Sequence, residues 1–215
     1  MTPLVVTAIT NFILACEVFF LGGLLVGQSK ARGSALWFWT AALLALGTSA
    51  LLGGIDHGFI EPASLQAQLP LYRLTWLVLG VMTLCVLLTT ARQFFSRRWF
   101  GLFLAIGLVQ LAVLALLVVV VGQFWVVIVN YVPVIVLFLV MNILGLRDRH
   151  GSWALVTGIL LMLLASLVQY SGFDALTPLD HNGLYHVMAM LGVLFLYRGG
   201  HDTLRPMLDL KSTLR

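Results

Sequence analysis

The sequence predicts an all-α protein that crosses a membrane seven times, with its N-terminus outside and its C-terminus in the cytoplasm. Three observations lead to this fold class. Of the 215 residues, 61% are hydrophobic and only 9% are charged, whereas a soluble domain carries about 25% charged residues. The apolar residues gather into stretches long enough to cross a bilayer, and nearly all the basic residues between them fall on one side.

The number of helices follows from the lengths of the apolar stretches. A transmembrane helix needs about 20 apolar residues to cross roughly 30 Å of hydrocarbon. The fourth and fifth stretches are separated only by Gly122 and Gln123. One helix through both would be far longer than a single span, so we expect a tight reversal at Gly122. The seven expected spans cover approximately residues 3–27, 35–55, 71–91, 99–121, 124–146, 153–170 and 182–199.

The basic residues indicate the orientation of the bundle. With the N-terminus outside, eleven of the twelve Lys and Arg residues fall on the inner side, and only Arg73 falls on the outer side. Lys and Arg are enriched in the cytoplasmic loops of membrane proteins, and an even number of spans would destroy this asymmetry. We therefore expect residues 1–200 to form a single seven-helix transmembrane domain and residues 201–215 a short cytoplasmic tail. The protein would be integral to a bacterial inner membrane.

The basic residues do not indicate a nucleic-acid partner. The net charge is +4, but the Lys and Arg residues are scattered singly and in pairs. A nucleic-acid surface would need a clustered basic patch. The expected partner is a membrane lipid, as substrate or ligand, and the sequence leaves the oligomeric state open.

Polar residues of several helices are expected to meet in one layer near the outer surface. A helix rises about 1.5 Å per residue, so the position of a residue within its span gives its depth. By this measure His57 lies at the outer end of the second helix, and His186 lies about one turn into the seventh. Other residues of this layer are Arg73, Trp76, Asn130, Tyr131, Gln169, Tyr170 and Ser171.

His57 and His186 are candidate metal ligands. Imidazole is a common ligand of Zn²⁺, and catalytic zinc usually takes three protein ligands and a water molecule. His181 is the candidate third ligand. It is five residues from His186, about 140° round a helix, so the two can converge only if His181 lies on the loop before the helix. Asp56, beside His57, is an alternative oxygen ligand or a partner that orients a ligand.

Structural roles compete with these assignments. Histidines at a membrane interface can cap helices or extend toward water, and Asp180 is a candidate N-cap of the last helix. Arg73 could pair with Asp56 or Glu61, or extend to lipid headgroups. Glu17 lies near the middle of the first helix, where a carboxyl group acts either in proton transfer or as a neutral, hydrogen-bonded group.

These residues resemble the pattern of the CREST superfamily, in particular a bacterial branch of it. That superfamily contains the alkaline ceramidases and the progestin and adipoQ receptors. The likeness covers the seven-helix topology, the histidine that ends the second helix (His57) and the Tyr185-His186 pair that opens the seventh. The resemblance implies zinc held by histidines of these helices for amide hydrolysis. Two positions differ, since Gly53 stands where the superfamily has Ser and Asn182 where it has a first His on the seventh helix.

The leading hypothesis is therefore an intramembrane, zinc-dependent hydrolase that cleaves an amide or acyl linkage of a lipid in the outer third of the bundle. Zinc held by His57, His186 and either His181 or Asp56 would activate a water molecule and polarise the carbonyl group.

Three residues are candidates to stabilise the oxyanion of this reaction, namely Ser49, Tyr185 and Arg73. Two alternatives stay open. The first is a non-catalytic lipid-binding or receptor-like membrane module, or a subunit of a larger complex. The second is a membrane protein in which His57 and His186 are the axial ligands of a haem.

Overall fold

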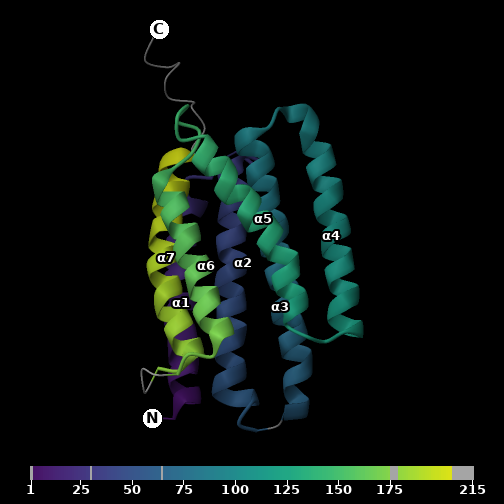
Figure 1. Cartoon of the computed structure of the whole chain (residues 1–215), viewed down its shortest axis with the longest axis vertical. Helices are drawn as coiled ribbons and strands as arrows, with labels where there is room; N and C mark the ends of the chain where they lie inside the picture. The colour runs from purple at the N-terminus through teal and green to yellow at the C-terminus, as the bar shows by residue number, and fades with distance from the viewer. Residues whose placement is uncertain (1, 30, 64, 175–178, 205–215) are drawn as a thin grey trace.

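Seven α-helices and no β-strand make up the described part of the chain, which confirms the all-α prediction. The computed structural model describes residues 2–29, 31–63, 65–174 and 179–204. A π-helical turn, η1 (Asp56–Ile60), follows α2, and a 3₁₀ turn, η2 (Arg97–Trp99), precedes α4. The helices are α1 (Pro3–Val26), α2 (Ala35–Ile55), α3 (Leu65–Phe94), α4 (Phe100–Val120), α5 (Trp125–Leu144), α6 (Trp153–Ser171) and α7 (His181–Thr203) (Figure 1).

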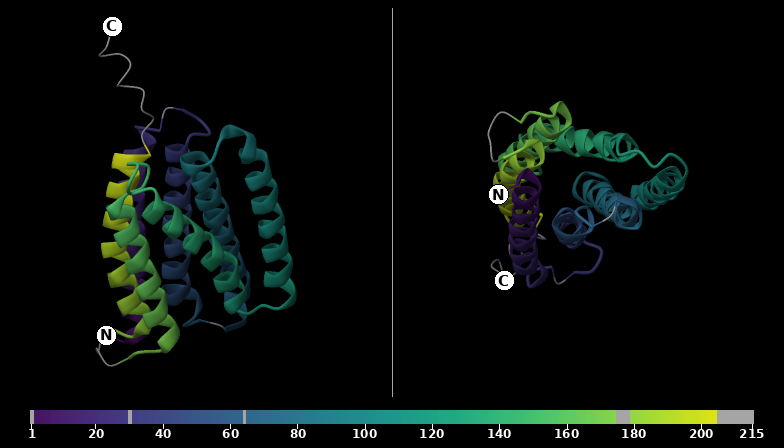
Figure 2. Two further views of the ribbon diagram at one scale, coloured as in Figure 1. Left: turned by 45° about the horizontal axis from the view of Figure 1, so that its top comes forward. Right: turned by 90° about the horizontal axis from the view of Figure 1, so that it is seen from below.

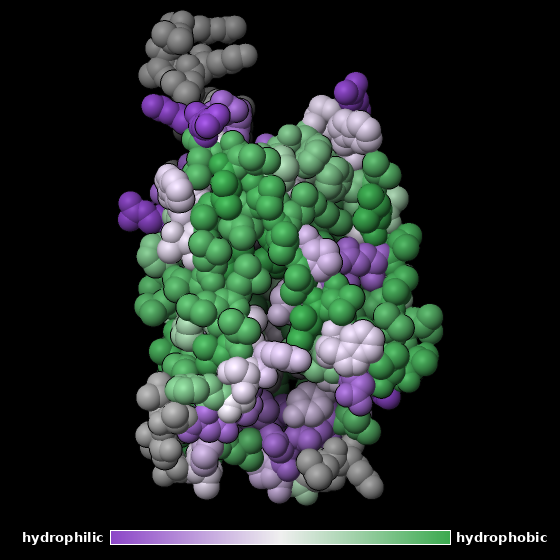
Figure 3. Space-filling model, in the orientation of Figure 1, coloured by the Kyte–Doolittle hydropathy of each residue, from purple (hydrophilic) through white to green (hydrophobic). Residues whose placement is uncertain are grey.

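Six of these helices, α1 to α6, are long and apolar enough to cross a membrane. Large apolar side chains are exposed along them, and hydrophobic residues cover most of the face in Figure 3. The chain is therefore an integral membrane protein. Helix α7 is long enough at 23 residues, but it is the least apolar of the seven helices over its length. Its status as a seventh span and the orientation of the bundle stay predictions.

The reversal expected at Gly122 is confirmed. Helix α4 ends at Val120 and α5 begins at Trp125. Gly122 adopts a left-handed φ of +61°, a conformation that glycine reaches without the steric cost of a Cβ atom.

Two helices extend beyond the expected spans. Helix α3 begins at Leu65, not at residue 71, and contains Pro70. Hydropathy marks only the part of a helix inside the hydrocarbon, and a proline near a helix start removes a single backbone hydrogen bond. Helix α7 continues to Thr203, into the segment expected to be the tail, and residues 205–215 lie outside the described residues.

The helices form a bundle that is tight on one side and looser on the other. Helix α1 packs against α2 and α7, α3 lies beside α2, and α6 packs along α7. Helix α4 lies at the edge, against α3, and α5 crosses the bundle obliquely toward α6 (Figures 1 and 2). The N-terminal ends of α1, α3, α5 and α7 therefore lie at the same end of the molecule as the C-terminal ends of α2, α4 and α6. We refer to it as the outer end.

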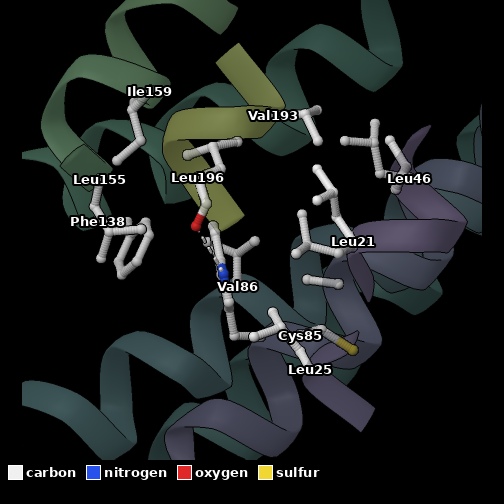
Figure 4. Close-up of a cluster of buried hydrophobic side chains, with 14 of the residues drawn as sticks. Leu21, Leu25, Leu46, Cys85, Val86, Phe138, Leu155, Ile159, Val193 and Leu196 are labelled. Carbon is white, nitrogen blue, oxygen red and sulfur yellow. Dashed lines mark hydrogen bonds between the residues drawn. The ribbon is translucent and has the colours of Figure 1, made fainter. Parts of the chain in front are cut away.

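The main core consists of interlocking apolar side chains of six helices (Figure 4). Phe138, Leu155 and Val193 are completely buried in it. One polar contact crosses the core, since the indole Nε1 of Trp39 donates a hydrogen bond to the carbonyl oxygen of Leu196 at 3.3 Å. Beyond this core, at the outer end, lies a group of polar side chains around a cavity.

Candidate functional site

A cavity at the outer end brings together the two histidines that the sequence singles out. His57 and His186 both line it, from the end of α2 and from α7. Ser49 and Tyr185, two of the predicted site residues, line the same cavity. The other polar residues of its wall are Asn11, Tyr72, Thr75, Gln169 and Asn182.

His186 is held in place by helix α1. Its side chain is buried, with 5% exposed, and its Nδ1 lies 2.9 Å from the Thr10 hydroxyl. That hydroxyl also lies 3.0 Å from the carbonyl oxygen of Thr7, within its own helix. Because Nδ1 is engaged by Thr10, Nε2 is the ring nitrogen left for a ligand.

His57 is oriented in the same way by a carboxylate. It lies in the π-helical turn η1 and is half-buried, and its Nδ1 is 2.6 Å from Oε2 of Glu61. A carboxylate only accepts hydrogen bonds, so Nδ1 carries the proton and Nε2 is the nitrogen left for a ligand. Metal-binding histidines commonly have their second nitrogen bonded in this way.

Asp180 connects the start of α7 to α1. Its Oδ1 accepts hydrogen bonds from the backbone N–H of Gly183 at 2.7 Å and from the Thr7 hydroxyl at 2.8 Å. The role of Asp180 as N-cap is thereby confirmed. This contact and the Thr10–His186 contact lie one turn apart along α1, and together they fix the position of His186.

The structure does not bring His181 to the cavity. Helix α7 begins at His181, so both histidines are helical and their five-residue separation directs them apart. The ring Nδ1 and the backbone N–H of His181 both bond to Oδ1 of Asp174 at 2.8 Å. These hydrogen bonds lower the pKa of the exposed Asp174 carboxyl. The expected role of His181 as third ligand has no support from its position.

Asp56 and Arg73 also lie outside the cavity wall. Asp56 is completely buried, and its Oδ2 accepts a hydrogen bond from Gln68 at 3.4 Å. Arg73 is half-buried and forms no ion pair with a described residue. Neither expected pairing of Arg73, with Asp56 or with Glu61, is therefore made. Glu61 pairs with His57 instead.

A second, apolar cavity adjoins the polar one. The two cavities share five lining residues, and the apolar one continues inward between α2, α3, α5, α6 and α7. Figure 3 shows pale and polar side chains recessed in the lower half of the molecule, where this face is hollowed. The shared residues are Leu46, Leu79, Phe124, Gln169 and Tyr185.

The comparison with known proteins adds one finding. Residues 6–205 match the model of a family of unknown function, DUF6962. The chain belongs to the DUF6962 family. No curated protein and no solved structure matches it. The matched region of this DUF6962 protein contains α2 to α7, all of α1 except its first three residues, and every residue that lines the two cavities.

Some cavity contacts of the DUF6962 protein were not predicted from the sequence. Tyr72 lines the cavity from α3, at the very start of the span expected there. Thr10 holds His186, although it lies on a different helix, 176 residues away. The helical spacing of Thr7, Thr10 and Asn11 was the available signal, since residues three and four apart share a face.

The donors of the polar cavity only partly suit a catalytic zinc ion. Two imidazoles are present, each with its Nδ1 already bonded. Among the described residues, the wall adds no third imidazole, thiolate or carboxylate, whereas catalytic zinc usually takes three protein ligands. Asn182, which stands nearest to the expected third position, instead accepts a hydrogen bond from Gln169 at 3.0 Å. The cavity wall therefore does not complete a zinc site.

Proposed function

We propose that this DUF6962 protein binds a membrane lipid, with its polar group in the outer cavity and its hydrocarbon chain in the apolar cavity. The observation that carries the proposal is that the two cavities adjoin and share part of their walls, including Leu46, Phe124 and Tyr185. Ligand sites typically combine a mostly apolar wall with a few converging polar groups. An amphiphile matches a site in which these two kinds of wall follow one another.

The wall favours a neutral polar group over a phosphate. The cavity offers hydroxyl, amide and imidazole groups, such as Ser49, Asn182 and His186, and no Lys or Arg among its described residues. Charged phosphates are usually bound by Arg or Lys, and an unpaired charge is costly away from water. A lipid with hydroxyl or amide groups, such as an N-acyl or acylglycerol type, therefore fits best.

The loose side of the bundle offers a route from the bilayer. Helix α5 crosses obliquely, so α5 and α6 diverge toward the outer end (Figure 1). Phe124 and Gln169 lie on this side and belong to both cavities. A lipid that moves laterally between α5 and α6 would reach the polar cavity without crossing water.

A cavity-filling variant tests the proposal. Ile135 lines the apolar cavity, whereas Ile143, two turns further along the same helix, is 46% exposed. Lipids extracted from the purified protein would be measured by mass spectrometry. We expect Ile135→Trp to lose the bound lipid and Ile143→Trp to retain it. Equal lipid content in the two folded variants would overturn the proposal.

Zinc-dependent hydrolysis of an amide or acyl linkage in that lipid is the second candidate function. One observation favours it, namely that His57 and His186 line the same cavity as Ser49 and Tyr185, two candidate oxyanion donors. The wall supplies two of the three protein ligands that catalytic zinc usually takes. Release of fatty acid from N-acyl and acylglycerol lipids, compared between the wild type and His186→Ala, tests this function. The absorbance spectrum of the same preparation tests the haem alternative.

A further inference from the structure

We infer that the π-helical turn η1 is a binding site for a divalent metal ion, formed by Asp56, His57 and Glu61. This site goes beyond lipid binding and differs from a zinc ion held between His57 and His186. A ligand atom of each of the three residues lies within 4.8 Å of the others. The cluster lies beside the polar cavity, and only His57 belongs to both.

The local backbone explains why these three side chains converge. The backbone N–H of Glu61 donates to the carbonyl oxygen of Asp56 at 2.9 Å, which is the i to i+5 hydrogen bond of a π-helix. Such single π-helical turns occur frequently at functional sites. The wider turn places Glu61 over Asp56 and His57.

A buried, unsatisfied carboxylate oxygen is the second observation. Asp56 has no exposed surface, and its Oδ1 has no hydrogen-bond partner among the described residues. Tyr72 lies next to this carboxylate but makes no hydrogen bond of good geometry to Oδ1. Leaving such an acceptor unpaired away from water costs free energy. A bound cation would remove this cost.

The charges of the cluster also favour a cation. Asp56 and Glu61 contribute two carboxylates to one small region. A protonated His57 would neutralise Glu61, which lies 2.6 Å from its Nδ1, but it would leave Oδ1 of Asp56 unpaired. A divalent ion would contact both carboxylates and balance their charge.

The donor atoms indicate which metal suits the site. One imidazole nitrogen and two carboxylate oxygens form a mixed set that suits zinc or a similar transition metal better than magnesium or calcium, which prefer oxygen alone. Two ligands at about 2.1 Å in a tetrahedron are about 3.4 Å apart. Zinc at Nδ1 of His57 would take the place of the proton that this nitrogen shares with Glu61, so Nδ1 and Oε2 would separate slightly from their present 2.6 Å.

The experiment is a zinc titration of the full-length protein in detergent, against a competing chelator dye, for wild type and four variants. Wild type should bind about one zinc ion per chain, and Asp56→Asn and Glu61→Gln should each weaken binding at least tenfold. His186→Ala should bind zinc like the wild type. Asp174→Asn, which removes an exposed carboxylate of another loop, serves as the matched control and should also be unchanged.

Several results would overturn the inference. These are no zinc binding by the wild type, wild-type affinity in Asp56→Asn and Glu61→Gln, or an equal loss in His186→Ala, which would place the ion in the polar cavity. Thermal unfolding of each variant confirms that it is folded. Lipid content, measured in the same samples, is expected to be unchanged in Asp56→Asn, so a failure of the metal site is distinguished from a failure of lipid binding.

Discussion

Nδ1 of His186 on α7 shares a hydrogen bond with the hydroxyl of Thr10 on α1, at 2.9 Å. This contact joins two helices from opposite ends of the chain and engages Nδ1, so Nε2 is the ring nitrogen of His186 that is left for a ligand. The chemistry available to the cavity therefore depends on the packing of α1 against α7.

Thr10→Val is expected to destabilise the protein. Valine has a similar shape but forms no hydrogen bond, so the buried Nδ1 of His186 loses its partner, at a cost of about 1–3 kcal/mol. Thr89→Val is the matched control, because Thr89 is also buried but bonds only to Cys85 of its own helix. Unfolding in a denaturing detergent measures the stability of both variants. Equal stability of the two variants would contradict the role assigned to Thr10.

Asp180→Ala is expected to loosen the start of α7. The substitution removes the N-cap of α7, which accepts a hydrogen bond from the backbone N–H of Gly183. It also removes the partner of the Thr7 hydroxyl. Losing an N-cap costs about 0.5–2 kcal/mol, and the second hydrogen bond adds to this. Amide hydrogen exchange should rise in the first turn of α7 and remain unchanged in α4. Unaltered exchange at Gly183 would show that Asp180 is not the cap.

Gly158→Ala is expected to separate α6 from α7. A Cβ atom at this position would lie 2.7–2.9 Å from atoms of Leu196, including its backbone nitrogen, so the helices would have to move. Overpacking of this kind costs about 1–3 kcal/mol. Gly101→Ala is the control, since a Cβ atom there meets nothing within 4 Å. A Gly158→Ala variant as stable as Gly101→Ala would refute the close packing.

The hydrogen bonds between His181 and Asp174 are expected to make the stability of the protein depend on pH at the outer surface. The pKa of Asp174 is lowered from its ordinary value of 3.8 by the hydrogen bonds from His181. A carboxyl group with a lowered folded pKa stabilises the fold above its ordinary pKa, and this contribution is lost as the pH falls through the lower, folded value. Carboxyl carbon NMR over a range of pH measures the pKa of Asp174 in the wild type and in His181→Ala. An unchanged Asp174 pKa in the variant would disprove the pairing.

Much of the fold could be predicted because hydrocarbon thickness fixes the length of a helix and because a single residue, Gly122, allows the reversal between α4 and α5. The start of α3 could not be predicted, since the residues from Leu65 to Pro70 lie outside the apolar stretch. Helix α7 is as long as a membrane span, but its polar residues make it less apolar than α1 to α6.

The candidate site was predictable only where depth alone decides the position. His57 and His186 lie at similar depths, and both line the outer cavity. The position of the His181 side chain depends on where α7 begins and on Asp174, a loop residue whose contact with His181 the sequence does not reveal. The π-helical turn was not predictable either, because it adds one residue to a helical turn without a distinct sequence pattern.

The most direct test of lipid binding is a crystal structure of the protein grown from a lipid mesophase. We expect elongated density that begins within hydrogen-bond distance of His57 or His186 and continues past Tyr185 to Ile135 in the apolar cavity. Only water in the polar cavity, with the apolar cavity closed by repacked side chains, would contradict the proposed function.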